Sequence, residues 1–303
     1  MSGPHALERL ITIEGHSYRP ILLTHPPTNT DSWIVHRLLF GLASKGDWPA
    51  CQALLVDGGL RSRFGVPPTT QAFAAAMSGA AAVAKPTGDV DADAKAPPDW
   101  MAAMRAQGLV PDVMAFNVAI QLQRRLGRWD RAVALLAEAE AAGVGPDVVS
   151  YTTAIAACGE AGRWERADEL LDAMQSRGVE PTVVTYTALM TAFGRAGELG
   201  RCWALRRAMT VAGVAPDPRF YRAAFAALAP AGDEEGCLGL LGELAASCQQ
   251  GLEGVALDED PAAAATDVRP RLDAVTYRHL QTICQTAGRL ELLALVEGPR
   301  GAR

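Results

Sequence analysis

The chain has 303 residues, a formal charge of -6 and 49% hydrophobic residues, which indicates one or two domains with a substantial core. Its uncharged stretches are broken by Gly, Pro or Ser before they reach the roughly 18 residues that a membrane span needs, which excludes a transmembrane helix. Aromatic residues are only 6% of the chain, which disfavours a large β-sandwich or barrel. The acidic balance argues at first sight against a nucleic-acid ligand.

The N-terminal segment, residues 1–29, has no clear structural pattern. Met1–Pro20 lacks the continuous apolar core of a secretory signal, and Glu8 and Glu14 interrupt it in a way that is atypical of an organelle transit peptide. The six cysteines of the chain form no C-x-x-C pair. We therefore expect reduced thiols that pack as small core residues.

Two irregular helix pairs are expected before residue 113. The first lies within residues 34–56 and turns at Gly46. The second begins after Pro68 and ends with a helix at Trp100–Gly108. Residues 84–99 interrupt this second pair with a run rich in Pro, Asp and Ala, which predicts a loop insertion.

A repeat of 35 residues dominates the middle of the chain. Prolines, two series of glycines and a series of aromatic residues keep this spacing over four units: Pro111, Pro146, Pro181, Pro216; Gly108, Gly143, Gly178, Gly213; Gly127, Gly162, Gly197, Gly232; Phe116, Tyr151, Tyr186, Tyr221. Four marker series in one phase indicate a true structural repeat. The regular units are residues 113–147, 148–182 and 183–217.

Each regular unit has the pattern of two antiparallel helices. In residues 148–182, Tyr151, Ile155 and Cys158 form one apolar stripe at helical spacing, and Gly162 ends that helix. A second helix then runs to a left-handed stop at Gly178. Neither helix buries its stripe alone, so neighbouring units must stack. The sequence therefore predicts an all-α fold, an α-solenoid of stacked antiparallel helix pairs over residues 30–250.

After residue 250 the pattern weakens. Residues 251–272 are acidic and rich in Ala without periodicity, which predicts a disordered insertion. Residues 273–303 form a last degenerate repeat, and its short second helix, residues 290–296, has no polar cap, as expected of a truncated array. The two insertions, 84–99 and 251–270, together carry the whole formal charge of -6, so the net charge does not exclude an RNA ligand.

Signatures of catalysis are missing from the sequence. It has no G-x-S-x-G, P-loop or G-x-G-x-x-G motif, and its five histidines are not at metal-ligand spacings. Asp258, Glu259 and Asp260 are adjacent carboxylates, but they lie in the acidic insertion, which does not hold them rigidly. We therefore expect a binding protein and not an enzyme, with no metal, cofactor, small-molecule substrate or membrane partner.

The regular unit resembles the pentatricopeptide repeat (PPR) family. The resemblance rests on four segments: Val148–Thr152, Gly162–Ala167, Leu170–Met174 and Arg177–Pro181. The tetratricopeptide repeat is also a helix pair, but its period is about 34 residues and its pattern places a Leu-Gly inside the first helix. The proline at the end of each 35-residue unit here favours the PPR resemblance. The PPR resemblance implies a sequence-selective binder of single-stranded RNA in a chloroplast or mitochondrion. It also implies action in transcript processing, stabilisation or translation, together with other proteins of an RNA-processing complex.

The resemblance further implies two base-reading residues in each repeat. One follows the first-helix aromatic, and the other follows the proline between repeats. The three pairs are Asn117 with Asp147 for uracil, Thr152 with Thr182 for a purine, and Thr187 with Asp217 for guanine. The corresponding first positions in flanking repeats are Ala74, Arg222 and Arg278, which depart from the pattern.

Two further sets of residues have alternative interpretations. Met114, Val149 and Val184 occupy the places that sandwich bases in the family, or they are residues at the edge of the core. Arg124, Arg125, Arg128 and Arg201 lie near the turns, where they contact phosphates or pair with nearby carboxylates. A protein-binding scaffold without RNA contact remains the alternative to the RNA-binding function as a whole.

Overall fold

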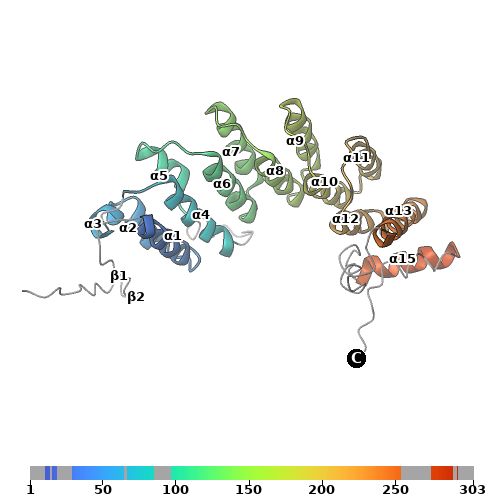
Figure 1. The fold of residues 1–303 in the computed structure, drawn as a ribbon, viewed down its shortest axis with the longest axis horizontal. Coiled ribbons are helices and arrows are strands. Elements are labelled where there is room, and N and C mark those ends of the chain that lie inside the picture. The colour runs from blue at the N-terminus through green and yellow to red at the C-terminus, as the bar shows by residue number, and fades with distance from the viewer. Residues whose placement is uncertain are drawn as a thin grey trace, which may run out of the picture. The chain divides into compact units, whose positions relative to one another are not determined.

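The computed structural model describes residues 11–13, 16–18, 29–64, 67–84, 97–253, 274–288 and 292. It has the predicted fold, in which antiparallel helix pairs follow one another along the chain as an α-solenoid (Figure 1). The chain divides into two compact units, Met1–Ala157 and Cys158–Arg303, with the boundary inside helix α8. Each unit is described by itself.

The first unit contains a short hairpin and the helix pairs up to α8. Its elements are β1 (Ile11–Ile13), β2 (His16–Tyr18), α1 (Asn29–Ala43), α2 (Trp48–Leu55), α3 (Gly59–Phe64), α4 (Thr70–Val83), α5 (Trp100–Ala106), α6 (Val113–Arg125), α7 (Trp129–Ala141) and the start of α8 (Val148–Glu160). Helix α4 packs between α1 and α6, while α7 packs on α6. The antiparallel hairpin and α3 are additions that the sequence did not predict.

The second unit continues the same arrangement. Its further elements are α9 (Trp164–Ser176), α10 (Val183–Ala196), α11 (Leu199–Val211), α12 (Pro218–Leu228), α13 (Glu234–Glu253) and α15 (Ala274–Thr286). Helix α10 packs on α12, and α9 and α11 lie on one side of these two helices (Figure 1).

The predicted insertion boundaries need one correction. Helix α13 runs through residues 251–253, so the expectation that irregular structure begins at residue 251 is wrong. Gln249, Gln250 and Leu252 have high helix propensity, which lets α13 continue into the start of that segment. The rest of the acidic insertion, most of 84–99 and nearly all of 290–296 lie outside the described residues.

Local chemistry explains where the helices begin and end. Asp112 accepts a hydrogen bond from the backbone N–H of Ala115 at 2.8 Å, which satisfies one of the free donors at the start of α6. Gly162 and Gly178 have φ angles of 72° and 73°, a left-handed conformation that only glycine adopts without steric cost. The predicted helix stops at these two glycines are confirmed.

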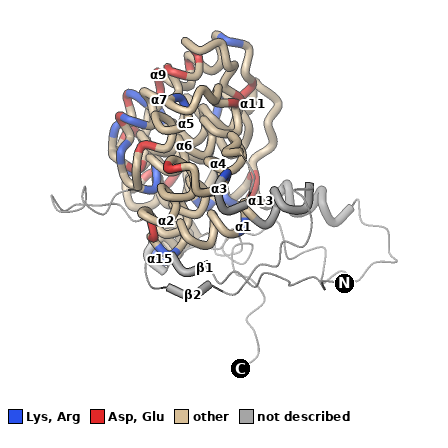
Figure 2. Tube along the Cα trace, turned by 90° about the vertical axis from the view of Figure 1, so that its left-hand side faces the viewer, with Lys and Arg blue, Asp and Glu red and all other residues tan. Residues whose placement is uncertain are grey.

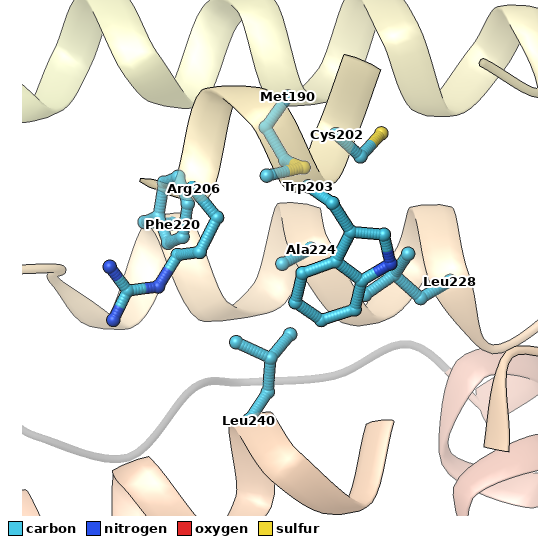
Figure 3. Close-up of a pocket in the computed structure, with 8 residues that line it drawn as sticks. All are labelled: Met190, Cys202, Trp203, Arg206, Phe220, Ala224, Leu228 and Leu240. Atoms are coloured by element: carbon cyan, nitrogen blue, oxygen red, sulfur yellow. The ribbon is translucent and has the colours of Figure 1, made fainter. Parts of the chain in front are cut away.

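The core follows the repeat. Phe116, Tyr151, Tyr186 and Tyr221 are each at most 3% exposed, so the aromatic series forms its centre. Between α10, α11, α12 and α13, side chains including Met190, Trp203, Phe220 and Leu240 close around a space too small for a water molecule (Figure 3). This region is packed core and not a ligand pocket.

The cysteines of the described residues behave as core residues. Cys51, Cys158, Cys202, Cys237 and Cys284 are buried. Burial raises the pKa of Cys51 and Cys237 to about 12. It raises the pKa of Cys158 and Cys202 to about 11. These four thiols stay protonated near neutral pH, which makes them poor nucleophiles.

Candidate nucleic-acid interface

The structure brings Asn117 and Asp147 together. Asn117 lies in α6 and Asp147 lies just before α8, and the Asn117 Nδ2 atom is 3.1 Å from both carboxylate oxygens of Asp147. Both side chains are only partly buried. Two residues that are 30 positions apart in sequence therefore form one polar site at the junction between consecutive repeats.

Ser150 completes this site, and sequence reasoning did not identify it. Its hydroxyl donates a hydrogen bond to Asn117 Oδ1, and its backbone N–H donates to Asp147 Oδ1 at 2.9 Å. Partial burial opposes ionisation of Asp147, but hydrogen bonds from Ser150 and Asn117 outweigh it and hold the pKa of Asp147 below its ordinary value. The carboxylate is therefore ionised at neutral pH and only accepts hydrogen bonds. A hydroxyl three residues after a capping Asp is the signal that points to Ser150.

The other predicted base-reading residues make local hydrogen bonds. Thr187 donates its hydroxyl to the carbonyl of Val183 at 2.7 Å, and Asp217 accepts from the N–H of Phe220 at 2.7 Å. Thr182 is the N-cap residue of α10. The residue after each repeat proline is thus also a helix cap. Thr152 belongs to the first compact unit and Thr182 to the second.

The three candidate base-sandwiching residues are exposed. Met114, Val149 and Val184 are 63%, 56% and 55% exposed. None of the three is therefore a buried core residue, and each has a side chain accessible to a ligand. Because residues three apart in a helix share a face, Met114 lies beside Asn117, and Val184 lies beside Thr187. Each first helix presents an apolar residue next to a polar one.

The candidate phosphate-binding arginines differ in their surroundings. Arg201 pairs with Asp168 at 2.6 Å, and its guanidinium lies 5.9 Å from the centre of the Trp164 ring. Arg125 is exposed near the end of α6, whereas Arg124 and Arg128 are half-buried and have interactions of their own. Arg201 is thus held in an interaction between second helices.

Ion pairs between second helices recur in both units. Arg105 of α5 pairs with Glu138 of α7 at 2.8 Å, and Arg206 of α11 pairs with Glu243 of α13 at 2.5 Å. Charged residues of both signs mark α7 and α9 in Figure 2. The second helices therefore use their charges to contact one another, which leaves the first helices as the candidate ligand face.

The flanking repeats and a small cavity have fewer features of a ligand-binding site than the regular repeats. Ala74 is 8% exposed, so it has neither the polarity nor the access of a base-reading residue. Arg222 and Arg278 are exposed. A cavity of about 20 Å³ beside Trp100 and Gln123 has room for one water molecule.

Within the described residues, no cluster of three His, Cys, Asp or Glu side chains could hold a metal ion. No helix in the same residues has both the length and the apolar character that a bilayer crossing demands.

Comparison with known proteins identifies the repeat. A PPR repeat family model matches residues 146–195, and a PPR repeat model matches residues 184–214. No curated protein sequence matches the chain.

Among solved structures, the chain resembles the pentatricopeptide repeat protein PPR10 in complex with an 18-nt psaJ RNA element, with 22% identity and a TM-score of 0.51 over 89% of this chain and 40% of that chain. PPR10 from maize in a second structure gives 26% identity and a TM-score of 0.48 over 90% of this chain and 41% of that one. The PPR domain of Arabidopsis thaliana protein-only RNase P 1 in complex with tRNA gives 17% identity and a TM-score of 0.45 over 59% of this chain and 89% of that one.

The chain thus spans about two fifths of the length of PPR10. The likeness to PPR10 in its RNA complex shows a shared fold, and the two repeat models together match the second regular unit and most of the third. Together, the two models identify PPR repeats over residues 146–214, within a chain that shares the helical fold of PPR10.

Proposed function

We propose that this chain binds single-stranded RNA along its first helices and reads one base per repeat. The observation that carries the proposal is the exposed apolar residue that recurs one position into each regular first helix, at Met114, Val149 and Val184. Exposed apolar side chains cost free energy in water unless a ligand covers them. A flat base has apolar faces and a polar edge, so it fits between two such residues beside a polar side chain.

The resemblance to the PPR family implies a short target for these repeats. By that resemblance, Asn117 with Asp147 reads uracil, Thr152 with Thr182 a purine, and Thr187 with Asp217 guanine. The resulting core of the target is U-purine-G. The PPR10 structure contains bound RNA, which supports the class of ligand proposed for this chain.

Selection of RNA from a randomised single-stranded pool tests this proposal. We expect enrichment of U-purine-G, and we expect the double variant Asn117→Ala/Thr187→Ala to lose that preference. Each lost base contact is worth about 1–3 kcal/mol, so the double variant should lose at least tenfold in affinity for the selected RNA. Specific capture of a protein with no RNA enrichment would instead support the scaffold alternative.

The arginines give a second test of the same proposal. Arg125→Ala is expected to reduce the dependence of log affinity on log salt concentration by about 0.7, the value for one phosphate contact on a single strand. Arg201→Ala should leave that slope unchanged, because Arg201 is paired with Asp168. Fluorescence anisotropy with the selected RNA over a salt series measures both slopes. An unchanged slope for Arg125→Ala, or a reduced slope for Arg201→Ala, would contradict this assignment.

We also propose that the chain acts in a chloroplast or mitochondrion, on transcript processing, stabilisation or translation, and through binding alone. Three bases are too few to specify a transcript, so further specificity comes from partner proteins of an RNA-processing complex. Imaging of the tagged full-length chain, followed by sequencing of crosslinked RNA from that compartment, tests the location and the transcript together. RNA crosslinks found only in the cytosol would contradict the organellar proposal.

A further inference from the structure

We propose that Ser150 is a positioning residue for base recognition, because its hydroxyl fixes the orientation of the Asn117 side-chain amide. The inference rests on the proposed RNA-binding function and concerns the same site. Ser150 is 1% exposed, so it does not itself contact a ligand. An effect of its hydroxyl on recognition therefore passes through Asn117 or Asp147, the two side chains to which it is hydrogen-bonded.

A closed network of hydrogen bonds joins these three residues. The Ser150 hydroxyl donates to Asn117 Oδ1 and also lies 3.0 Å from Asp147 Oδ1. It accepts the backbone N–H of Asp147 at 3.2 Å. The Asn117 amide nitrogen donates to the Asp147 carboxylate at 3.1 Å. The amide is thus held on its oxygen side by Ser150 and on its nitrogen side by Asp147.

Donor and acceptor chemistry permits only one orientation of this amide. The ionised Asp147 carboxylate accepts hydrogen bonds and donates none, so it must face Nδ2 of Asn117. Turning the amide over would place Oδ1 against the carboxylate, acceptor against acceptor, and would leave the Ser150 hydroxyl proton without its present acceptor on Asn117. The observed arrangement is therefore set by chemistry and not by an arbitrary assignment of the two amide atoms.

A fixed amide discriminates between the two pyrimidines. The Asn117 amide retains one N–H and one oxygen lone pair for a ligand, since each amide atom uses one partner in the network. Uracil presents a ring N–H beside carbonyl oxygens, whereas cytosine presents a ring nitrogen acceptor beside an amino group. An amide that turns over freely matches either edge. An amide held in one orientation matches only one of them, which the resemblance assigns as uracil.

Other repeats provide an internal comparison. Thr185 occupies the place of Ser150 one repeat later, and its hydroxyl likewise accepts the N–H of the preceding cap residue, Thr182, at 3.2 Å. One repeat further on, Phe220 occupies the equivalent position and has no hydroxyl. In that repeat Thr187 donates its hydroxyl proton to the Val183 carbonyl of its own helix. Thr185→Ala therefore removes the same kind of cap hydrogen bond as Ser150→Ala without touching Asn117.

The test measures the ratio of affinities for two RNAs that differ only in U or C opposite Asn117. We expect a preference of about tenfold or more for one pyrimidine in the wild-type chain, as for a good pair of hydrogen bonds to a base edge. Ser150→Ala should bring the ratio close to one. Ser150→Thr, which keeps the hydroxyl, and Thr185→Ala should retain the wild-type ratio. An unchanged ratio in Ser150→Ala, with RNA still bound, would overturn the inference.

A second measurement needs no RNA. The chain has only two asparagines, Asn29 and Asn117, so asparagine-selective ¹⁵N labelling gives two side-chain amide signals, which an Asn29→Gln variant assigns. We expect the Asn117 amide protons to exchange with solvent several-fold faster in Ser150→Ala than in the wild type or in Thr185→Ala. Equal exchange would overturn the inference even if no RNA binds, whereas failure of RNA binding with the expected exchange would overturn only the proposed function. Urea unfolding of each variant confirms that it is folded.

Discussion

Replacing Met114, Val149 and Val184 together by glutamate is expected to reduce RNA affinity at least a hundredfold and to leave the stability of the fold unchanged. Stacking against a base is worth about 1–3 kcal/mol per base, so the loss of three contacts amounts to about 3 kcal/mol or more. Added carboxylates beside the RNA phosphates increase the loss. The side chains are 55% exposed or more, so unfolding should change by less than about 0.5 kcal/mol per substitution.

A matched control uses exposed valines that lie outside the first helices. Val211 is 90% exposed at the end of α11, and Val110 is 78% exposed just before the repeat proline Pro111. The double variant Val110→Glu/Val211→Glu should keep both the RNA affinity and the urea midpoint of the wild type. Anisotropy titrations and urea unfolding measure the two quantities. Wild-type affinity in the triple variant would exclude the proposed face, and a large drop in its urea midpoint would show that these residues serve the core.

Gly194→Ala is expected to destabilise the second compact unit by about 1–3 kcal/mol, the typical cost of overpacking. A Cβ at Gly194 would lie 2.3 Å from the Cβ and 3.0 Å from the Cα of Ala227, so α10 and α12 would have to move apart. The same approach occurs one repeat earlier, where a Cβ at Gly159 would lie 2.7 Å from the Ala192 Cβ. Small residues at these places let neighbouring first helices pack closely.

Gly239→Ala is the control for this prediction. Gly239 lies in α13, and a Cβ there would meet no atom within 4 Å beyond its chain neighbours and the adjacent backbone of its own helix. Alanine is a better helix former than glycine, so this variant should gain about 0.5–1 kcal/mol. Urea unfolding followed by circular dichroism compares the two variants with the wild type. If Gly194→Ala is as stable as Gly239→Ala, the close approach of α10 and α12 is not needed for the fold.

The helix pairs could be predicted well because their signals are local. Proline restricts its own φ angle, and glycine alone adopts the left-handed angle without cost, so Pro146, Gly162 and Gly178 mark the limits of one unit wherever it packs. The aromatic series also predicted the core, because its residues recur at one position on the apolar stripe of each first helix. Short elements with weak patterns, such as α3 and the hairpin of β1 and β2, gave no comparable signal, and the end of α13 was placed too early.

The candidate site, too, could be predicted from the sequence only in part. The sequence by itself determined the repeat, its phase and the positions of the polar and apolar residues on each first helix, since these depend on spacing along one helix. Only the tertiary structure decided that Asn117 contacts Asp147, that Ser150 orients the amide, and that Arg201 pairs with Asp168, 33 residues earlier. These contacts join consecutive repeats. They depend on the stacking distance and rotation of neighbouring helices, which packing sets and no local sequence pattern encodes.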